Sequence, residues 1–445
     1  MPDESAVSPT AAAPRYAWYV IGVLMVLNIS SFIDRQVMSL MTEPIKTDLG
    51  LTETEMSLLL GPAFGITFAI AVFFMGRLAD RYSRRAIIGW GVAIWSVMCT
   101  ASGIASTFGQ LFAARVGVGA GEATLSPSAY SLIADYFPPN RLATAMSIFT
   151  SGVFLGAGLA YLIGGLVVEL VQTMQPWNLP VVGEIRPWQK VFVLLGAPGL
   201  LLALLALTIR EPPRVLDAAG NRVVFRLPEV FAWFRRHAAA YGTFGVGIGL
   251  FAVVNYGTAF WFPAYFARAH GWETGKIGVI MGVATMVFGA LGAILGGRVA
   301  DRFKARGRSD GNLRVLVISA VVSVAVAFPL FAPPSEPVMI AALIVTNLVA
   351  AMPFGAAAAA AQEMTPRPMR GTASALLVFI LNFIGLGVGP PAVALLTDHV
   401  FQDITRVGMS LLVVTVVGRS LSAVIVGLGL GAHRRVLAEL SAAPA

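Results

Sequence analysis

Twelve long apolar segments run through this chain, and they leave few folds open to it. A membrane-crossing helix needs about 20 largely apolar residues. The segments that meet this length, numbered spans 1 to 12 in chain order, are 16–42, 56–79, 85–105, 108–136, 142–171, 188–209, 239–267, 275–300, 313–331, 337–363, 371–397 and 407–432. Only 12% of the residues are charged, whereas soluble domains carry about 25%. We therefore predict an all-α membrane protein with twelve transmembrane helices.

The basic residues predict which side of the membrane each loop occupies. An even number of spans puts both chain ends on one side. That side then holds 22 of the 31 Lys and Arg residues, the other side holds six, and three lie well within spans. Because loops rich in Lys and Arg stay in the cytoplasm, we expect a multi-pass protein of a bacterial inner membrane with both termini cytoplasmic. The net charge of +8 then reflects topology and contact with membrane lipids, so no nucleic-acid partner is expected.

The chain contains an internal repeat. Residues 76–81 (GRLADR) at the end of span 2 recur as residues 297–302 (GRVADR) at the end of span 8. A second repeated feature is a group of proline and arginine residues that precedes both span 5 and span 11. We therefore expect two pseudo-symmetric six-helix halves. The expected boundaries are a disordered cytosolic tail at 1–15, a first half at 16–209, a cytoplasmic linker with a surface amphipathic helix at 210–238, a second half at 239–432 and a tail at 433–445.

These features resemble the major facilitator superfamily, whose transporters are built from two parallel six-span repeats. The span 2–3 loop of that superfamily has the pattern G-x-L-A-D-R-x-x-R-R, which residues 76–85 match. Three stretches resemble the Spinster group within it: Ser31 to Arg35 in span 1, Arg115 to Glu122 in span 4, and Asn382 to Pro390 in span 11. The resemblance implies transport by alternating access and substrates such as sphingoid or lysolipid species.

Four ionisable residues lie inside apolar spans: Asp34 and Arg35 in span 1, and Arg115 and Glu122 in span 4. Each such charge costs at least ~2.5–3.5 kcal/mol in hydrocarbon, so these residues usually mark transport pathways. Arg115 and Glu122 share a helix face about 10 Å apart along the axis, whereas Asp34 and Arg35 point about 100° apart. We expect Asp34 and Glu122 to carry protons, Arg115 to switch between them, and Arg35 to bind a head group or pair structurally. The alternative is a static buried salt bridge that fixes helix packing.

Span 4 also contains a glycine-rich run at Gly117, Gly119 and Gly121. A nucleotide-binding loop would need a preceding strand and a βαβ unit, and neither is expected here. Small residues instead allow neighbouring membrane helices to approach closely. Pro127 is expected to loosen the helix beside Glu122, because proline removes a backbone hydrogen bond.

The duplicated loop is the expected cytoplasmic gate. The resemblance implies that its aspartate meets the start of a helix in the opposite half, span 11 for Asp80 and span 5 for Asp301, where the helix dipole favours a carboxylate. The second copy lacks the paired arginines, which predicts a weaker latch. A loop that only sets topology is the alternative. The expected gate residues are Gly76, Asp80, Arg81, Arg84, Arg141, Asp301, Arg302 and Arg370.

Other polar residues within the spans are candidates to line a central cavity. They are Asn28, Ser31, Tyr130, Asn255, Tyr256, Asn347, Asn382 and Arg419. Each asparagine taken alone is better explained as a helix–helix hydrogen bond than as a substrate ligand. Arg419 is the deep charge of the second half. It would bind an anionic head group, face a water-filled crevice, or show that span 12 is placed wrongly.

No cofactor is expected. The single cysteine and the four scattered histidines do not form a metal-ligand pattern, and no nucleophile pairs with a histidine, so an enzyme is not expected either. We predict a monomeric secondary active transporter that moves a small amphipathic or lipid-like substrate, coupled to protons. The alternatives are a drug exporter or an organic-acid or sugar carrier of the same fold. A non-transporting membrane sensor is less well supported, because no segment outside the membrane is long enough for an obvious signalling domain.

Overall fold

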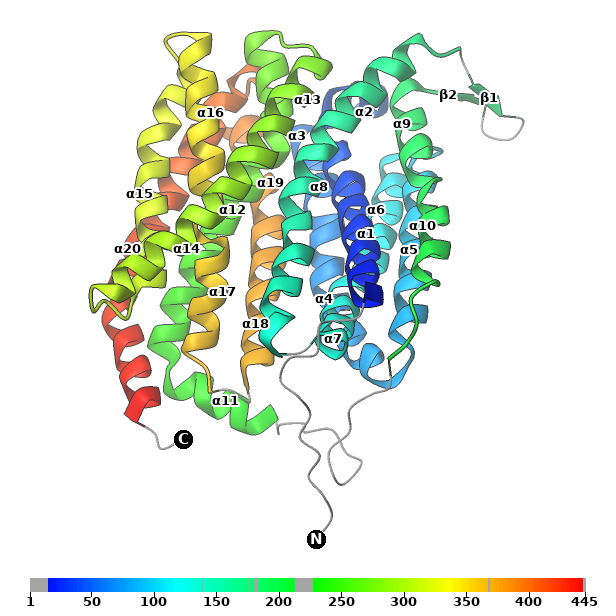
Figure 1. Cartoon of the computed structure of the whole chain (residues 1–445). Helices are drawn as coiled ribbons and strands as arrows, with labels where there is room; N and C mark the ends of the chain where they lie inside the picture. The colour runs from blue at the N-terminus through cyan, green and yellow to red at the C-terminus, as the bar shows by residue number, and fades with distance from the viewer. Residues whose placement is uncertain are drawn as a thin grey trace.

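The computed structural model describes residues 15–137, 139–175, 177–179, 183–212, 227–366 and 369–442. Two helical bundles lie side by side (Figure 1). The first contains α1 (Arg15–Leu40), α2 (Thr42–Leu49), α3 (Glu53–Leu60), α4 (Pro62–Arg81), α5 (Arg84–Ser102), α6 (Phe108–Glu122), α7 (Leu125–Tyr136), α8 (Pro139–Thr173), α9 (Pro187–Gly196) and α10 (Gly199–Ala206). A short antiparallel hairpin, β1 (Trp177–Leu179) and β2 (Gly183–Ile185), precedes α9.

The second bundle follows a surface helix, α11 (Leu227–Arg236). It contains α12 (Ala238–His270), α13 (Thr274–Val283), α14 (Ala290–Ala305), α15 (Gly311–Phe331), α16 (Glu336–Ala351), α17 (Pro353–Glu363), α18 (Arg370–Ile380), α19 (Gly387–Leu395) and α20 (Val407–Ala442). Three π-helical turns, η1 (Ala284–Gly289), η3 (Leu381–Leu386) and η4 (Leu396–Phe401), and one 3₁₀ turn, η5 (Ile404–Arg406), interrupt its helices. The last helix therefore continues well past the expected end of span 12 at residue 432.

Eleven stretches of the described chain are helical, long and apolar enough to cross a membrane. The predicted span 4 is missing from that set because it is broken into α6 and α7. With these two helices counted as one span, the described chain has the twelve spans that the sequence predicts. The break follows Glu122 at Ala123 and Thr124, whose backbone N–H groups bond to Gly119 and Gly121. Pro127 explains it, because a proline ring clashes with the carbonyl four residues earlier, here that of Ala123. The expected loosening beside the acid is thus observed.

The surface helix α11 lies across one end of the second bundle (Figure 1). We call this end of the molecule, where α1 begins and α20 ends, the terminal face, and the end that carries α2 and the hairpin the opposite face. The indole N–H of Trp233 in α11 donates to the Tyr241 hydroxyl (3.0 Å) and to the Met364 carbonyl oxygen (3.3 Å). These bonds attach α11 to the second bundle, on the side where the sequence predicts a surface amphipathic helix.

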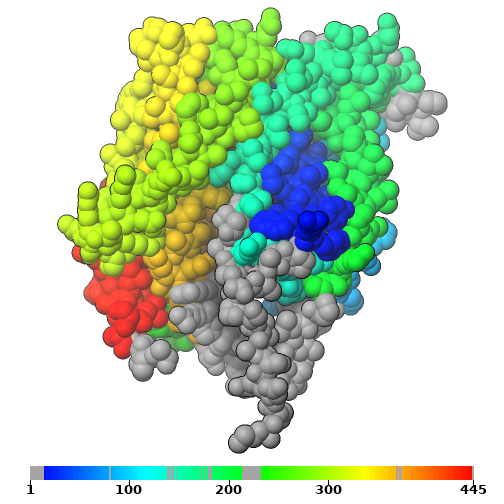
Figure 2. Space-filling view, viewed as in Figure 1, coloured from blue at the N-terminus to red at the C-terminus, as the bar shows by residue number. Residues whose placement is uncertain are grey.

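Small residues let the two bundles meet closely along α8 and α13. A Cβ atom added to Gly278 of α13 would lie 2.6 Å from the Tyr161 carbonyl oxygen and 3.1 Å from the Gly165 Cα of α8. A Cβ atom at Gly158 would likewise lie 2.8 Å from the Gly282 carbonyl oxygen. Figure 2 shows side chains of the two bundles in contact in the upper part of the molecule, toward the opposite face. The halves are therefore packed together at that end.

Candidate functional site

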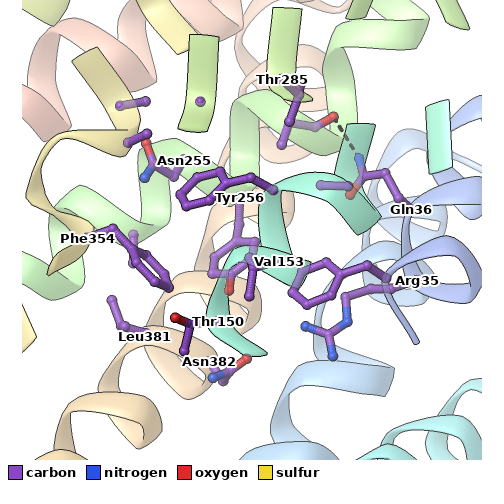
Figure 3. Close-up of a pocket in the computed structure, with 18 of the residues that line it drawn as sticks. Arg35, Gln36, Thr150, Val153, Asn255, Tyr256, Thr285, Phe354, Leu381 and Asn382 are labelled. Atoms are coloured by element: carbon purple, nitrogen blue, oxygen red, sulfur yellow. Dashed lines mark hydrogen bonds between the residues drawn. The ribbon is translucent and has the colours of Figure 1, made fainter. Parts of the chain in front are cut away.

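A cavity of about 380 Å³ lies between the two bundles and takes its lining from both. Seven of the eight candidate cavity residues line it: Asn28, Ser31, Tyr130, Asn255, Tyr256, Asn347 and Asn382. Figure 3 shows Arg35 and Gln36 of α1 on one wall and Asn255, Phe354 and Leu381 of the second bundle facing them. Most of the wall is apolar, and it includes eight phenylalanines: Phe32, Phe68, Phe149, Phe154, Phe251, Phe260, Phe262 and Phe354.

The charged residues of this lining are Arg35 and Glu122, which form an ion pair. The Arg35 Nη2 atom lies 2.6 Å from Glu122 Oε2, which also accepts a hydrogen bond from the Ser31 hydroxyl at 2.8 Å. The other carboxylate oxygen of Glu122 is buried and has no hydrogen-bond partner in the part of the chain that the structure describes. The Arg35 guanidinium carbon lies 4.3 Å from the centroid of the Phe64 ring, within cation–π distance. This pair connects α1 to the end of α6 at the helix break.

Asp34 and Arg115 lie outside the cavity lining. Asp34 directly precedes Arg35, and Arg115 is in the same helix as Glu122; Arg35 and Glu122 both line the cavity. Asp34 and Arg115 are both buried, and Arg115 Nη1 donates to the backbone oxygen of Asp34 at 3.3 Å. The Asp34 carboxylate faces the Cys99 thiol of α5 at 3.6 Å. Consecutive helical residues point about 100° apart, so Arg35 faces the cavity while Asp34 faces α5. In this conformation the partner of Glu122 is therefore Arg35, and not Arg115 as the sequence suggested.

Two cavity residues that the sequence analysis did not single out join the bundles. Gln36 donates through Nε2 to the Tyr161 hydroxyl, and that hydroxyl donates to the Ala259 carbonyl oxygen of α12 at 2.8 Å. Gln36 directly follows Arg35 in span 1. A polar side chain inside an apolar span is a signal in the sequence that could have identified it. Tyr161 gave no such signal, because a tyrosine within a span is compatible with ordinary packing.

The candidate polar residues of the second bundle either line the cavity or lie behind its wall. Asn347 accepts from the Thr285 hydroxyl at 3.1 Å and Asn382 donates to its own helix at the Val378 carbonyl oxygen at 2.9 Å. Arg419 does not line the cavity. It is buried behind the wall and donates to the side-chain oxygen of Asn255, which does line it.

The expected gate residues do not link the two halves in the described part of the terminal face. Arg84 is buried and pairs within the first bundle, through Nε with Glu211 Oε1 at 2.7 Å and through Nη1 with Asp135. A Cβ atom added to Gly76 would meet nothing within 4 Å, and Arg141, Asp301 and Arg302 are exposed. The side chains of Asp80, Arg81 and Arg370 lie outside the described residues. In the second repeat Ala305 occupies the position of Arg84, and the neighbouring Lys304 pairs with Glu363 at 2.5 Å.

Polar contacts across the halves gather at the opposite face, where the sequence analysis predicted none. Arg268 at the end of α12 pairs with Glu43 of α2 at 2.5 Å and with Glu53 of α3 at 2.9 Å. Glu53 is buried and also pairs with Lys46. The backbone N–H of Thr54 donates to the Asp398 carboxylate at 2.7 Å. Burial and the nearby Arg268 charge lower the pKa of Lys46 from 10.5 to about 8.

Among the described residues, no three His, Cys, Asp or Glu side chains gather in a way that could hold a metal ion. The site is instead a largely apolar cavity with one ion pair, closed by charged contacts at the opposite face. Such a geometry can enclose a molecule between two bundles that move relative to one another.

Comparisons with known proteins agree with this architecture. The family model described as Major Facilitator Superfamily matches residues 23–390 and 283–424. An MFS-type efflux pump of Mycolicibacterium smegmatis is 27% identical over 428 residues, which are 96% of this chain and 95% of the pump. Protein spinster homolog 1 of Xenopus tropicalis is 25% identical over 413 residues, 88% of this chain and 75% of that protein.

The fold also matches a crystal structure of a bacterial homologue of the human lysosomal transporter Spinster, in an inward-facing and unoccupied conformation. The TM-score is 0.76 and the identity 24%, with 98% of this chain and 100% of that chain covered. The relatives and structural neighbours are transporters rather than enzymes, and the resemblance to the Spinster group is confirmed.

Proposed function

The chain belongs to the major facilitator superfamily of transporters, and we propose that it moves a small amphipathic or lipid-like molecule by alternating access, driven by protons. The observation that carries this proposal is the cavity between the bundles, which combines a mainly aromatic and aliphatic wall with a single ion pair. An apolar wall suits a tail, and a few placed polar groups suit a head group. We place both termini in the cytoplasm, on the side favoured by the basic loops, and we treat the monomer as the working unit.

The hydrogen-bond donors of the cavity favour an amphipathic substrate over a sugar. A buried sugar needs a partner for each hydroxyl, because an unpaired polar group costs about 1–3 kcal/mol. Three of the lining asparagines instead donate through Nδ2 to backbone carbonyl oxygens, Asn28 at 3.3 Å and Asn347 and Asn382 at 2.9 Å each. One of the two N–H donors of each carboxamide is therefore already used, which reduces the number of free polar groups on a mostly apolar surface.

We assign proton coupling to Glu122. Asp34 is a second carboxyl group that would take part in proton transfer after a change of conformation. Glu122 lines the cavity, and its Oε1 atom has no hydrogen-bond partner among the described residues, so a proton arriving by way of the cavity has an acceptor. Protonation would remove the charge attraction that holds Arg35. Arg35 would then be free to contact a substrate or to move with α1, which would couple the proton to the conformation.

The test is uptake of a radiolabelled lysophospholipid into proteoliposomes with an imposed pH gradient. We expect the gradient to accelerate uptake by the unsubstituted protein, and Glu122→Gln to lose that acceleration while it keeps slow downhill exchange. Glu184→Gln, at an exposed residue of β2, is the matched control and should behave like the unsubstituted protein. Full gradient-driven uptake by Glu122→Gln would contradict the coupling assignment, and no uptake of any lysophospholipid would contradict the substrate class.

A drug exporter of the same fold is the second candidate, favoured by the similarity to an efflux pump along nearly the whole chain. The same apolar cavity suits hydrophobic drugs as well as lipids. Competition separates the two candidates. A cationic dye such as ethidium should displace a bound lysophospholipid only weakly if the lipid-like substrate is correct, and strongly if the protein is a drug exporter.

A further inference from the structure

Arg419 is a buried arginine without a carboxylate partner in the described chain. It is 2% exposed, and its Nη1 atom donates to the Phe251 backbone oxygen at 3.1 Å. Its guanidinium carbon lies 3.5 Å from the centroid of the Phe251 ring, and its Nε atom has no hydrogen-bond partner. A buried charge is costly unless something compensates it. The backbone oxygen and the ring supply only part of that compensation.

The remaining contact of Arg419 fixes the orientation of Asn255. Arg419 Nη2 donates to Asn255 Oδ1. Because a guanidinium group carries donors and no acceptor, the oxygen of the Asn255 carboxamide must face Arg419. The Asn255 Nδ2 group then points away from Arg419, on a residue that lines the cavity (Figure 3).

Asn255 differs in this respect from the other asparagines of the cavity. Asn28, Asn347 and Asn382 each donate through Nδ2 to a backbone carbonyl oxygen. No acceptor among the described residues takes a hydrogen bond from Asn255 Nδ2. Asn255 thus presents a carboxamide whose two N–H donors are both free of acceptors among the described residues, held in place by a positive charge behind it.

The two halves also differ in how their buried charges are balanced. In the first half Asp34, Arg35, Arg115 and Glu122 are two acids and two bases, so their formal charges cancel. Among the described residues of the second half Arg419 has no such counterion, and electrostatic attraction to an anion is strong in a surrounding of low dielectric constant. A negatively charged group at Asn255 would accept its hydrogen bond and would also lower the cost of burying Arg419.

We propose that Asn255, oriented by Arg419, forms a subsite for an anionic oxygen of the substrate, from a phosphate or a carboxylate group. Asn255 donates to that oxygen, and Arg419 acts as a positioning residue that also supplies positive potential. The inference rests on the proposed function in one respect, namely that the cavity is the substrate site. It assigns the head group to the second half and leaves the apolar tail to the phenylalanine-rich walls.

The experiment measures equilibrium binding of two matched ligand pairs to the purified full-length protein in nanodiscs. One pair is 1-oleoyl lysophosphatidic acid and 1-oleoylglycerol, which differ by a phosphate. The other is glucuronate and glucose, which differ by a carboxylate. We expect tighter binding of the anionic member of the lipid pair by about tenfold or more, the usual value of a hydrogen bond to a charged group.

Three variants test the assignment. Asn255→Leu removes the donor, and Arg419→Gln removes the positive charge. Asn255→Asp gives Arg419 a carboxylate partner and so keeps the buried arginine paired, which guards against a simple folding defect. All three should lose the preference for the anion. Ser422→Ala is the control, because the buried Ser422 hydroxyl also joins α20 to α12, at the Gly247 carbonyl oxygen (2.7 Å), but lies outside the cavity lining.

The outcomes separate this inference from the proposed function. An anion preference in either pair that is lost in the three variants and kept in Ser422→Ala supports the subsite. Equal binding within both pairs, no binding of any of the four ligands, or a preference that survives Asn255→Leu would overturn it. A preference seen in the sugar pair alone, without binding of either lipid, supports the subsite but contradicts the lipid-like substrate of the proposed function.

Discussion

The charged residues of spans 1 and 4 show what a sequence reveals at the scale of single residues. Their cost in hydrocarbon marks Arg35 and Glu122 as functional candidates, and both line the cavity. The sequence did not reveal that Arg35, rather than Arg115, pairs with Glu122. That choice depends on how α1 is rotated about its axis, and a step of one residue changes the direction by about 100°. The rotation is set by packing against neighbouring helices, which hydrophobic spacing does not specify.

Lys46 gives a pH-dependent prediction at the same scale. Burial, together with the Arg268 charge, lowers its pKa to about 8 while the opposite face is closed. Opening that face to water should return the pKa toward 10.5. Between these values the closed conformation binds fewer protons than the open one, so raising the pH from about 8 to 10.5 should favour closure.

This effect can be measured as the labelling rate of a cysteine placed at Ala267, a half-buried residue beside Arg268 at the opposite face, in a Cys99→Ala background. The rate should fall as the pH rises through this window, after correction for the reactivity of a free thiol. Lys46→Met should remove the pH dependence. A labelling rate that rises with pH, or an unchanged dependence in Lys46→Met, would show that Lys46 does not report on closure.

At the scale of elements, helix breaks follow local chemistry and were partly predictable. Pro127 predicted the interruption beside Glu122, and the structure places it between α6 and α7. The same reasoning explains the break between α3 and α4, where Pro62 is the first residue of the second helix. The π-helical turns were not predictable, because the residues of η1 and η3 carry no local signal that separates them from an ordinary apolar helix.

The glycine contact between α8 and α13 gives a prediction at this scale. A methyl group at Gly278 would meet the Tyr161 backbone oxygen at 2.6 Å, and a backbone atom cannot move aside as a flexible side chain can. Gly278→Ala should therefore hold the bundles apart at the opposite face and reduce the maximal transport rate several-fold, with little loss of expression. Gly22→Ala is the control, because nothing lies within 4 Å of a Cβ atom at Gly22. Equal rates for both variants in proteoliposome uptake would contradict the role of this contact.

At the scale of the whole molecule, the sequence predicted the two bundles but not which end of them is closed. The repeat and the basic loops directed attention to the terminal face, whereas the contacts between halves gather around Arg268 at the opposite face. Arg268 and Glu53 lie at the ends of apolar segments, where a charge is ordinary and gives no signal. A sequence also cannot specify one of several conformations that the same chain adopts. We therefore predict a second state, in which the Arg268 contacts separate and the terminal face closes.

The most direct test of this account measures distances at both faces of one protein in liposomes. Cys99 is the single cysteine of the chain, so Cys99→Ala allows spin labels at chosen pairs. The pair Thr47 and Glu273 reports on the opposite face, and the pair Arg85 and Ser309 reports on the terminal face; all four residues are exposed. With lysophospholipid present and the pH lowered, the first distance should lengthen while the second shortens, and Glu122→Gln should lose the dependence on pH. Two distances that stay fixed, or that change in the same direction, would contradict proton-coupled alternating access.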